Sequence, residues 1–500
     1  MTTLRVHRRA FAVAAMSIVI ATSLPAAYPP GRQHTQPYYD IVIAGGRVLD
    51  PDRGTDTVMS IGISAGSIGT ISAQPLAGRY VIHAEGLVVA PGFIDLLSYN
   101  PVEPGVWTKI ADGVTTALAM HGGTEDPEKW YGMFKKQRVP LHYGASFFYS
   151  EARVRHVRDR YQKASPEARA KILAAEEEAL RRGALGVSFA LEYVPGVSRE
   201  EIVPAMTLAA RYGVPVFFHA RYSDMQEPGT NIDALREIID DARMTHASVH
   251  IDHLNSTGGT FSMEQSLGMI DSARAAGLDI TACMYPYTYW GTYLNSARFD
   301  AGWQDRFHIT YHDLQLGGSS ERLTKESFAA YRRKGLLAVA YAIPDEDNRT
   351  CLRSPYVMIG SDAILEPGFN NHPRASGTCS RTIAVYVRDQ HVLSLMDAVA
   401  KMTILPARRM EQACPGMARK GRLQAGADAD IVIFDAARIR DRATVEHPDL
   451  PSEGIHYVLV AGNIVLDPQG LHKGIRAGQP MRGPNRVPPR AGTAAVPEPR

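Results

Sequence analysis

The sequence is poor in cysteine, with four among 500 residues. So few cysteines exclude a small disulfide-stapled scaffold, and a chain this long can bury a large core without such bridges. The hydrophobic fraction of 45% is ordinary for a globular protein. The sequence leaves open whether a single bridge forms between two of the cysteines in an oxidising compartment.

An excess of charge is also missing, because 54 Lys and Arg residues stand against 52 Asp and Glu residues, for a net charge of +2. Nucleic-acid and membrane-surface proteins need a concentrated positive charge, so this balance argues against both classes. Beyond the N-terminus, no apolar run reaches the length of a membrane span. We therefore expect a small-molecule partner and no nucleic acid.

The N-terminus has the layout of a secretory signal peptide over residues 1–27. Residues 5–9 are basic, residues 10–24 are nearly free of polar groups, and Pro25-Ala26-Ala27 offers small residues for cleavage. We expect export to the periplasm or beyond. Arg8-Arg9 also fits the twin-arginine signal. An uncleaved membrane anchor, or two arginines that are adjacent by chance in an ordinary signal peptide, would show the same residues.

Short strands are predicted near both ends of the mature chain, over residues 39–90 and 421–482. Both segments are rich in Val and Ile, are broken by Gly or Asp, and lack helical periodicity. This pattern predicts one small β-sandwich built from both segments. The tail over residues 483–500 is rich in Pro and Arg, and we expect it to be disordered.

Between these segments, apolar runs alternate with helical stretches, which is typical of a parallel α/β fold. The helix expected over residues 200–212 begins with Ser198 and Glu201 at the spacing of a capping box. Eight such repeats predict a TIM (β/α)8 barrel over residues 91–420. A doubly wound sheet is the alternative, but no Gly-rich nucleotide turn follows the first strand. The eight expected strands are 88–95, 115–120, 142–147, 186–189, 215–219, 249–253, 280–284 and 357–362.

Several polar side chains stand at predicted strand ends, where the active site of a TIM barrel forms. His219, His253 and Asp362 end strands five, six and eight, and His121 follows strand two. Zinc prefers such nitrogen ligands and lowers the pKa of bound water, and a nearby carboxylate can then shuttle the proton. A lone strand-end histidine is more often structural, and we interpret His250 in that way. The joint arrangement favours a function.

A series of short motifs runs along the chain from residue 39 to about residue 470. They include Gly113-Val114-Thr115-Thr116, Phe217-Phe218-His219-Ala220-Arg221-Tyr222, His250-Ile251-Asp252-His253, Tyr285-Pro286-Tyr287-Thr288, His372-Pro373-Arg374 and Gly426-Ala427-Asp428-Ala429-Asp430. The shared order of these motifs is far more specific than any single one of them. By this order the chain resembles the D-aminoacylase (N-acyl-D-amino-acid deacylase) branch of the amidohydrolase superfamily. The resemblance implies a TIM barrel with a β-sandwich, a zinc ion and hydrolysis of N-acyl-D-amino acids.

The resemblance also implies roles for single residues. His219 and His253 match the histidine ligands of the firmly held zinc, and Asp362 matches the catalytic aspartate. We expect Asp362 to carry the proton transfers and to contribute little to folding. An arginine fork pairs well with a substrate carboxylate, although an ordinary ion pair is at least as common. The candidates for substrate binding are Arg221, Tyr285 and Arg374.

The chain departs from the family at strand one. Relatives read Gly-Phe-Ile-Asp-x-His-x-His there, whereas this chain places Leu97 and Tyr99 at the two histidine positions. After strand two, relatives offer Cys or Glu as a ligand, and this chain has His121, which could also belong to a simple turn. We therefore expect one zinc ion per chain, held by His121, His219 and His253.

These observations predict an exported, metal-dependent amidohydrolase that cleaves the amide bond of N-acyl amino acids, of the D series by resemblance, or of related small amides. One alternative is a cyclic-amide hydrolase of the dihydroorotase or hydantoinase type. Another is a non-catalytic amidohydrolase-like binding protein, which the lost histidine pair favours. The sequence leaves the oligomeric state open.

Overall fold

The computed structural model describes residues 38–484. The expected signal peptide over residues 1–27, and residues 485–500 of the expected tail, lie outside the described residues. Within the described range, no helix combines the length and apolar character that a membrane crossing requires. All four cysteines are buried and carry free thiols.

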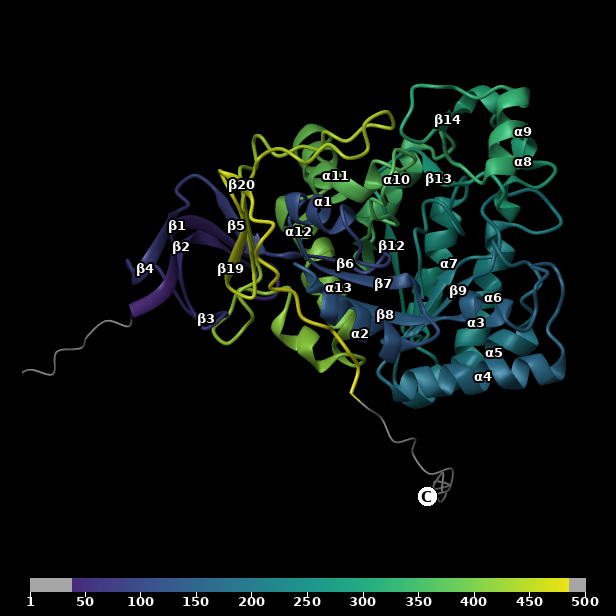
Figure 1. Cartoon of the computed structure of the whole chain (residues 1–500), viewed down its shortest axis with the longest axis horizontal. Coiled ribbons are helices and arrows are strands. Elements are labelled where there is room, and N and C mark those ends of the chain that lie inside the picture. Colours follow the sequence, from purple (N-terminus) through teal and green to yellow (C-terminus); the bar gives the residue numbers. More distant parts are fainter. Residues whose placement is uncertain (1–37, 485–500) are drawn as a thin grey trace, which may run out of the picture. The chain divides into compact units, whose positions relative to one another are not determined.

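A barrel-like sheet of eight strands with parallel pairing stands at the centre of the described chain, and this confirms the predicted TIM barrel (Figure 1). Its strands are almost wholly buried, as is usual for a parallel sheet that is covered by helices. In order, the strands are β6 (Phe93–Asp95), β7 (Val114–Thr124), β8 (His142–Phe148), β9 (Val187–Ala190), β10 (Val216–His219), β11 (Val249–Ile251), β12 (Ile280–Met284) and β16 (Val357–Ile359).

Side chains join the two end strands of this sheet, β6 and β16. The backbone N–H of Ser361 donates to Asp95 Oδ1 over 3.0 Å, and the Ser361 hydroxyl donates to Asp95 Oδ2 over 2.6 Å. Lys109 Nζ lies 2.6 Å from Asp95 Oδ2 and 2.6 Å from Ser361 Oγ. Since all three residues are buried, the hydrogen bonds of Ser361 to Asp95, reinforced by Lys109, link the ends of the first and last barrel strands.

Helices follow the barrel strands and pack outside them. The helix predicted over residues 200–212 is α5 (Arg199–Tyr212), and the predicted capping box of Ser198 and Glu201 is present. The other α-helices are α1 (Gly105–Ala111), α2 (Pro127–Gln137), α3 (Tyr149–Val154), α4 (Pro166–Arg181), α6 (Asn231–Thr245), α7 (Met263–Ala275), α8 (Trp303–Phe307), α9 (Lys325–Lys334), α10 (Asp345–Arg353), α11 (Arg374–Arg381), α12 (Leu395–Met402) and α13 (Ile404–Glu411).

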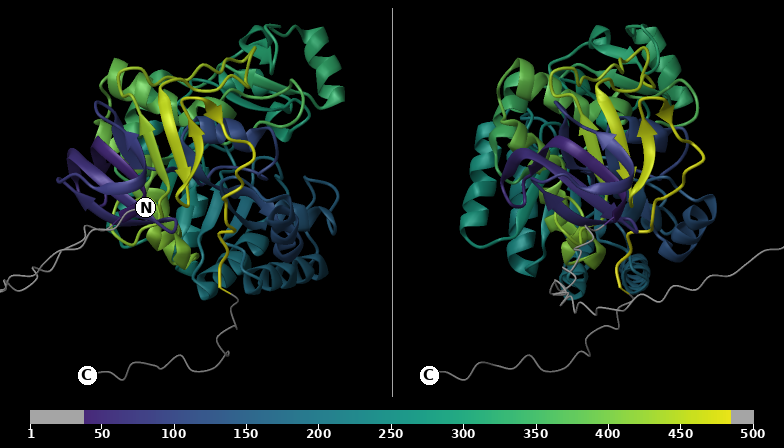
Figure 2. Two further views of the ribbon diagram at one scale, coloured as in Figure 1. Left: turned by 60° about the vertical axis from the view of Figure 1, so that its left-hand side comes forward. Right: turned by 90° about the vertical axis from the view of Figure 1, so that its left-hand side faces the viewer.

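Both ends of the described chain form one nine-stranded sheet, in the order β20-β19-β18-β17-β5-β1-β2-β3 with β4 paired to β1. Figure 2 shows the N-terminal strands in purple beside the C-terminal strands in yellow. The two ends meet where β5 pairs antiparallel with β17. The strands are β1 (Tyr38–Asp50), β2 (Thr55–Ser64), β3 (Ser67–Ser72), β4 (Ala77–His83), β5 (Val88–Pro91), β17 (Ile431–Phe434), β18 (Ile455–Val460), β19 (Asn463–Asp467) and β20 (Gly470–Leu471).

The prediction of a single first barrel strand over residues 88–95 was wrong. The run divides at Gly92, so β5 belongs to the nine-stranded sheet and β6 to the barrel. At Gly92 the backbone passes so close to Thr115 that a Cβ would lie 2.3 Å from its side chain. The continuous apolar run over residues 88–95 therefore contributes one strand to the nine-stranded sheet and one to the barrel.

The sequence did not predict a third, three-stranded sheet. It consists of β13 (Trp290–Tyr293), β14 (Leu314–Leu316) and β15 (Leu337–Ala340), inserted between the barrel strands β12 and β16. Aromatic side chains form its own core, including Trp290, Phe299, Trp303 and Phe328. Residues of β13 contribute to the wall of the main cavity of the barrel.

Candidate active site

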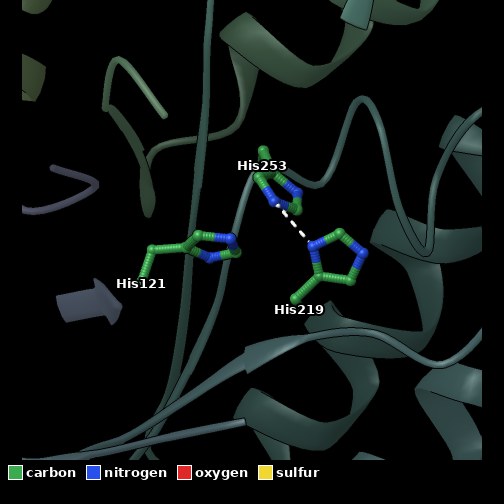
Figure 3. Close-up of side chains that lie close together, drawn as sticks. All are labelled: His121, His219 and His253. Carbon is green, nitrogen blue, oxygen red and sulfur yellow. Dashed lines mark hydrogen bonds between the residues drawn. The ribbon is translucent and has the colours of Figure 1, made fainter. Parts of the chain in front are cut away.

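Three histidines from three barrel strands converge at the carboxyl end of the sheet (Figure 3). His121 lies near the end of β7, His219 is the last residue of β10, and His253 comes two residues after β11. Their ring centroids are 4.6 to 5.5 Å apart, and one nitrogen of each ring lies within 4.8 Å of the others. The structure thus brings together all three predicted metal ligands.

One nitrogen of each imidazole is tied to a polar partner on the side away from the other rings. The pairs are His121 Nδ1 with Asp252 Oδ2 at 2.8 Å, His219 Nε2 with Glu192 Oε2 at 2.9 Å, and His253 Nδ1 with Thr257 Oγ1 at 3.1 Å. Such outer partners fix the tautomer and the orientation of metal-binding histidines. The second nitrogen of each ring is free of these outer partners and is available to bind the same metal ion. These nitrogens are His121 Nε2, His219 Nδ1 and His253 Nε2.

The electrostatics of two of the three rings suit metal binding. Burial lowers the pKa of His219 and of His253 well below the ordinary histidine value, so both rings are neutral and keep a lone pair for a metal. Burial also acts to lower the pKa of His121, but the hydrogen bond to Asp252 and the nearby Asp362 charge outweigh it and raise that pKa.

Asp362, just beyond β16, faces this cluster. Its Oδ1 lies 3.7 Å from His121 Nε2, and its Oδ2 lies 4.0 Å from His253 Nε2. Burial acts to raise the pKa of Asp362, but the positive charge of Arg374 and the neighbouring histidines prevail and lower it. The carboxyl group is therefore ionised and able to accept a proton.

Asp362 also has a structural partner that the sequence did not indicate. Arg374 Nη2 lies 3.0 Å from Asp362 Oδ2 and donates over 3.1 Å to the Asp362 backbone carbonyl. The Arg374 side chain is 3% exposed, so the loss of Asp362 would leave a buried cation unpaired. The expectation that Asp362 contributes little to folding does not account for this ion pair.

Two of these functional side chains stand on left-handed backbone. His253 has a φ of 28° and Asp362 a φ of 50°. Such conformations typically cost about 1–3 kcal/mol each and cluster at functional sites. In both cases the strand has just ended, so the left-handed turn sets the direction in which the side chain enters the site.

A cavity of about 830 Å³ opens over the cluster, within the size range of small-molecule sites. Tyr99, His121, Asp362 and Arg374 line it, together with residues from β13. The cavity gives a small substrate access to the face of His121 and Asp362.

The three predicted substrate-binding residues have different surroundings. Arg374 lines the cavity, and among the described residues its Nε and Nη1 have no hydrogen-bond partner. Its guanidinium lies 4.2 Å from the centre of the Tyr285 ring. Tyr285 is fully buried and does not line the cavity, so it supports Arg374 from beneath.

Arg221 points elsewhere. Its Nε and Nη2 donate to the two carboxylate oxygens of Glu237 over 2.9 and 2.8 Å. It also donates to the carbonyls of Pro195 and Val197 and lines a separate cavity of about 810 Å³. The structure does not bring Arg221 into the cavity over the histidines, because its fork is already paired with a carboxylate.

Glu192 and Asp252 were not predicted from the sequence as partners of the histidines. Asp252 precedes His253 directly, so the motif around strand six contained a signal for it. Glu192 lies two residues beyond β9, binds Ser223 and Arg298 as well as His219, and carries no recognisable motif.

The donor set fits a zinc ion. Two nitrogens bound tetrahedrally at about 2.0–2.1 Å would stand about 3.4 Å apart, and His219 Nδ1 and His253 Nε2 are 3.0 Å apart. On the strand-one side, Leu97 offers no donor atom and is fully buried, while Tyr99 offers only a phenol. Strand one therefore adds no histidine ligand to the set of His121, His219 and His253.

Comparisons with known proteins agree with this geometry. Residues 97–465 match the family model described as Amidohydrolase family. The chain is 31% identical to N-acyl-D-glutamate deacylase of Alcaligenes xylosoxydans xylosoxydans, over 85% of this chain and 93% of that protein. It is 29% identical to D-aminoacylase of the same organism, over 88% and 97% of the two chains. The crystal structure of the Bordetella bronchiseptica N-acyl-D-glutamate deacylase, complexed with zinc and a phosphonate inhibitor that mimics the tetrahedral intermediate, is similar with a TM-score of 0.76 and 26% identity. That match covers 89% of this chain and all of the other.

Proposed function

The chain belongs to the amidohydrolase family and within it to the D-aminoacylase branch, and from this premise we propose that it is a zinc-dependent N-acyl-D-amino-acid deacylase. One observation carries the proposal. Three imidazoles, each with one nitrogen held by a polar partner, turn their other nitrogens toward one another, and those of His121 and His253 face the carboxylate of Asp362, which lines a cavity.

In this proposal His121, His219 and His253 hold the ion. A bound zinc ion supplies Lewis-acid polarisation of the scissile carbonyl and lowers the pKa of water. Asp362 accepts the proton of the attacking water and delivers it to the leaving amine, as a positioned general base and acid does. Its lowered pKa suits the first step because the carboxylate must begin ionised.

Arg374 is the residue proposed to bind the substrate carboxylate. It is the arginine of the cavity that stands beside Asp362, so a carboxylate paired with it would lie close to the reacting amide. Its Nε and Nη1 are buried and have no hydrogen-bond partner among the described residues, and guanidinium–carboxylate pairs are directional and strong. Arg221, which pairs with Glu237, takes no part in this role.

We propose one ion per chain. Relatives of the family place a histidine pair on strand one, and here Leu97 and Tyr99 stand there. The structure supports a single ligand set among the described residues, since the other cluster, of His250, Asp252 and Cys283, shares Asp252 with His121.

The test is to purify the protein without chelators, measure zinc by mass spectrometry, and assay a panel of substrates. The panel holds N-acetyl derivatives of D- and L-glutamate, D- and L-aspartate and D- and L-leucine, with hydantoins and dihydroorotate as cyclic amides. We expect about one zinc per chain and turnover confined to the acyl-D-amino acids. Turnover of cyclic amides alone would refute the deacylase, and zinc-free protein without turnover would indicate a binding protein.

We also propose that the chain is exported with removal of residues 1–27, on the basis of its basic, apolar and small-residue segments. The protein should be recovered from the periplasm or medium, with its new N-terminus near residue 27 or 28 by terminal sequencing. Replacement of Arg8 and Arg9 by lysine should block export if the twin-arginine route is used.

A further inference from the structure

Tyr99 stands at one of the two positions where relatives of this family carry a metal-binding histidine on strand one. Its ring packs edge-on against His121, with centroids 5.6 Å apart and planes at 87°. A Cβ on Gly122 would come within 3.3 Å of the same ring. The phenol ring of Tyr99 therefore packs closely against the part of β7 that carries His121, and this packing restricts its position.

The hydroxyl of Tyr99 donates to Asp362 Oδ1 over 3.0 Å. Arg374 holds the other oxygen, Oδ2, over 3.0 Å. The two oxygens lie 3.7 and 4.0 Å from ring nitrogens of His121 and His253. Each carboxylate oxygen is thus fixed by one donor and faces one imidazole, so the two donors together set the rotation of the carboxylate plane.

We propose that Tyr99 is a positioning residue for Asp362, holding its carboxylate from the strand-one side where relatives place metal-binding histidines. The inference rests on the proposed function, in which Asp362 moves the proton. A general base must point at its proton within hydrogen-bond reach, and a carboxylate held by one donor alone would rotate about its terminal torsion.

A free phenol has a pKa of about 10, so the hydroxyl of Tyr99 carries its proton near neutral pH and can act as the donor to Asp362.

Leu97, the residue at the other position of the missing histidine pair, packs beside this contact. Its side chain is fully buried and packs so near Gly360 that a Cβ there would lie 2.5 Å from the Leu97 Cβ. Apolar packing thus fills the space between Leu97 and Gly360, close to Tyr99 in the chain.

The test is a double-mutant cycle of Tyr99→Phe and Asp362→Asn, because Phe removes one oxygen and keeps the ring. In the wild-type background we expect Tyr99→Phe to lower kcat about tenfold, the worth of one hydrogen bond to a charged group, with KM and zinc content unchanged. In the Asp362→Asn background the same change should have little further effect, since coupled residues are not additive.

Tyr293 provides the matched control. It is another tyrosine on the cavity wall, half exposed on β13. Tyr293→Phe should change kcat by the same factor in both backgrounds. If Tyr99→Phe also acted equally in both, Tyr99 would not work through Asp362 and the proposal would be overturned.

A second readout needs no activity. Thermal midpoints of the zinc-free wild type, Tyr99→Phe, Asp362→Ala and the double variant should show that the double variant loses less than the two singles together, because alanine removes the acceptor that asparagine would keep. Additive losses would contradict the hydrogen bond itself. A wild type that binds no zinc and hydrolyses nothing would refute the proposed function instead, while this thermal cycle would still report on the contact.

Discussion

Asp362→Asn removes one negative charge from the centre of the site and nearly preserves the side-chain shape. In the wild type this carboxylate faces two imidazole nitrogens and pairs with the buried Arg374. The variant keeps an amide oxygen that can still accept from Tyr99 or Arg374. It loses the ability to take a proton from water.

We expect two effects of separate origin. Turnover should fall at least about a hundredfold, which is the usual worth of a positioned general base, with zinc content unchanged because the histidine ligands remain. Stability should fall as well, because breaking a buried ion pair from one side typically costs about 3–5 kcal/mol. The retained amide dipole places the expected loss toward the lower end of that range.

The double variant Asp362→Asn/Arg374→Gln separates the two effects. Without the unpaired guanidinium, the free energy of unfolding in urea should recover most of the loss, while turnover should stay low. Initial rates on the best acyl-amino-acid substrate and equilibrium unfolding of the same samples provide the measurements. Near-full activity of Asp362→Asn would refute its role as the proton carrier. Equal stability of the single and double variants would show that the Arg374 charge is not destabilising when unpaired.

Three further outcomes follow from buried charges. Asp252→Asn should weaken zinc affinity about 10- to 100-fold in a competition titration, because the anionic partner of His121 becomes neutral. Lys109→Met should lower the free energy of unfolding by about 3–5 kcal/mol in a urea titration, since it leaves Asp95 uncompensated at the seam between β6 and β16. Burial raises the pKa of Asp112 from 3.8 to about 6, so the folded state retains a proton that the unfolded chain has already released. Wild-type stability relative to Asp112→Asn should therefore fall by about 2 kcal/mol as the pH rises from about 4 to about 6. Urea unfolding of both proteins at several pH values checks this, and a difference that does not vary with pH would contradict it.

The sequence by itself determined the barrel and most of its active site. Alternating apolar runs and helical stretches are local patterns, and parallel strands joined by helices have few ways to close. Because the carboxyl ends of barrel strands meet at one face, the positions of His219, His253 and Asp362 at strand ends were enough to predict that they converge. His121 joined them for the same reason.

Only the tertiary structure decided which partner each polar side chain takes. Arg221 and Arg374 look equally suited to bind a substrate carboxylate, yet one pairs with Glu237 and the other reaches Asp362. Glu192 meets His219 across 27 positions of sequence, and Tyr99 meets Asp362 across 263. The apolar run over residues 88–95 likewise divides between two sheets at Gly92. Local patterns report which faces are buried, whereas hydrogen bonds and ion pairs depend on angstrom-scale approach between segments far apart in the chain, which only the folded structure fixes.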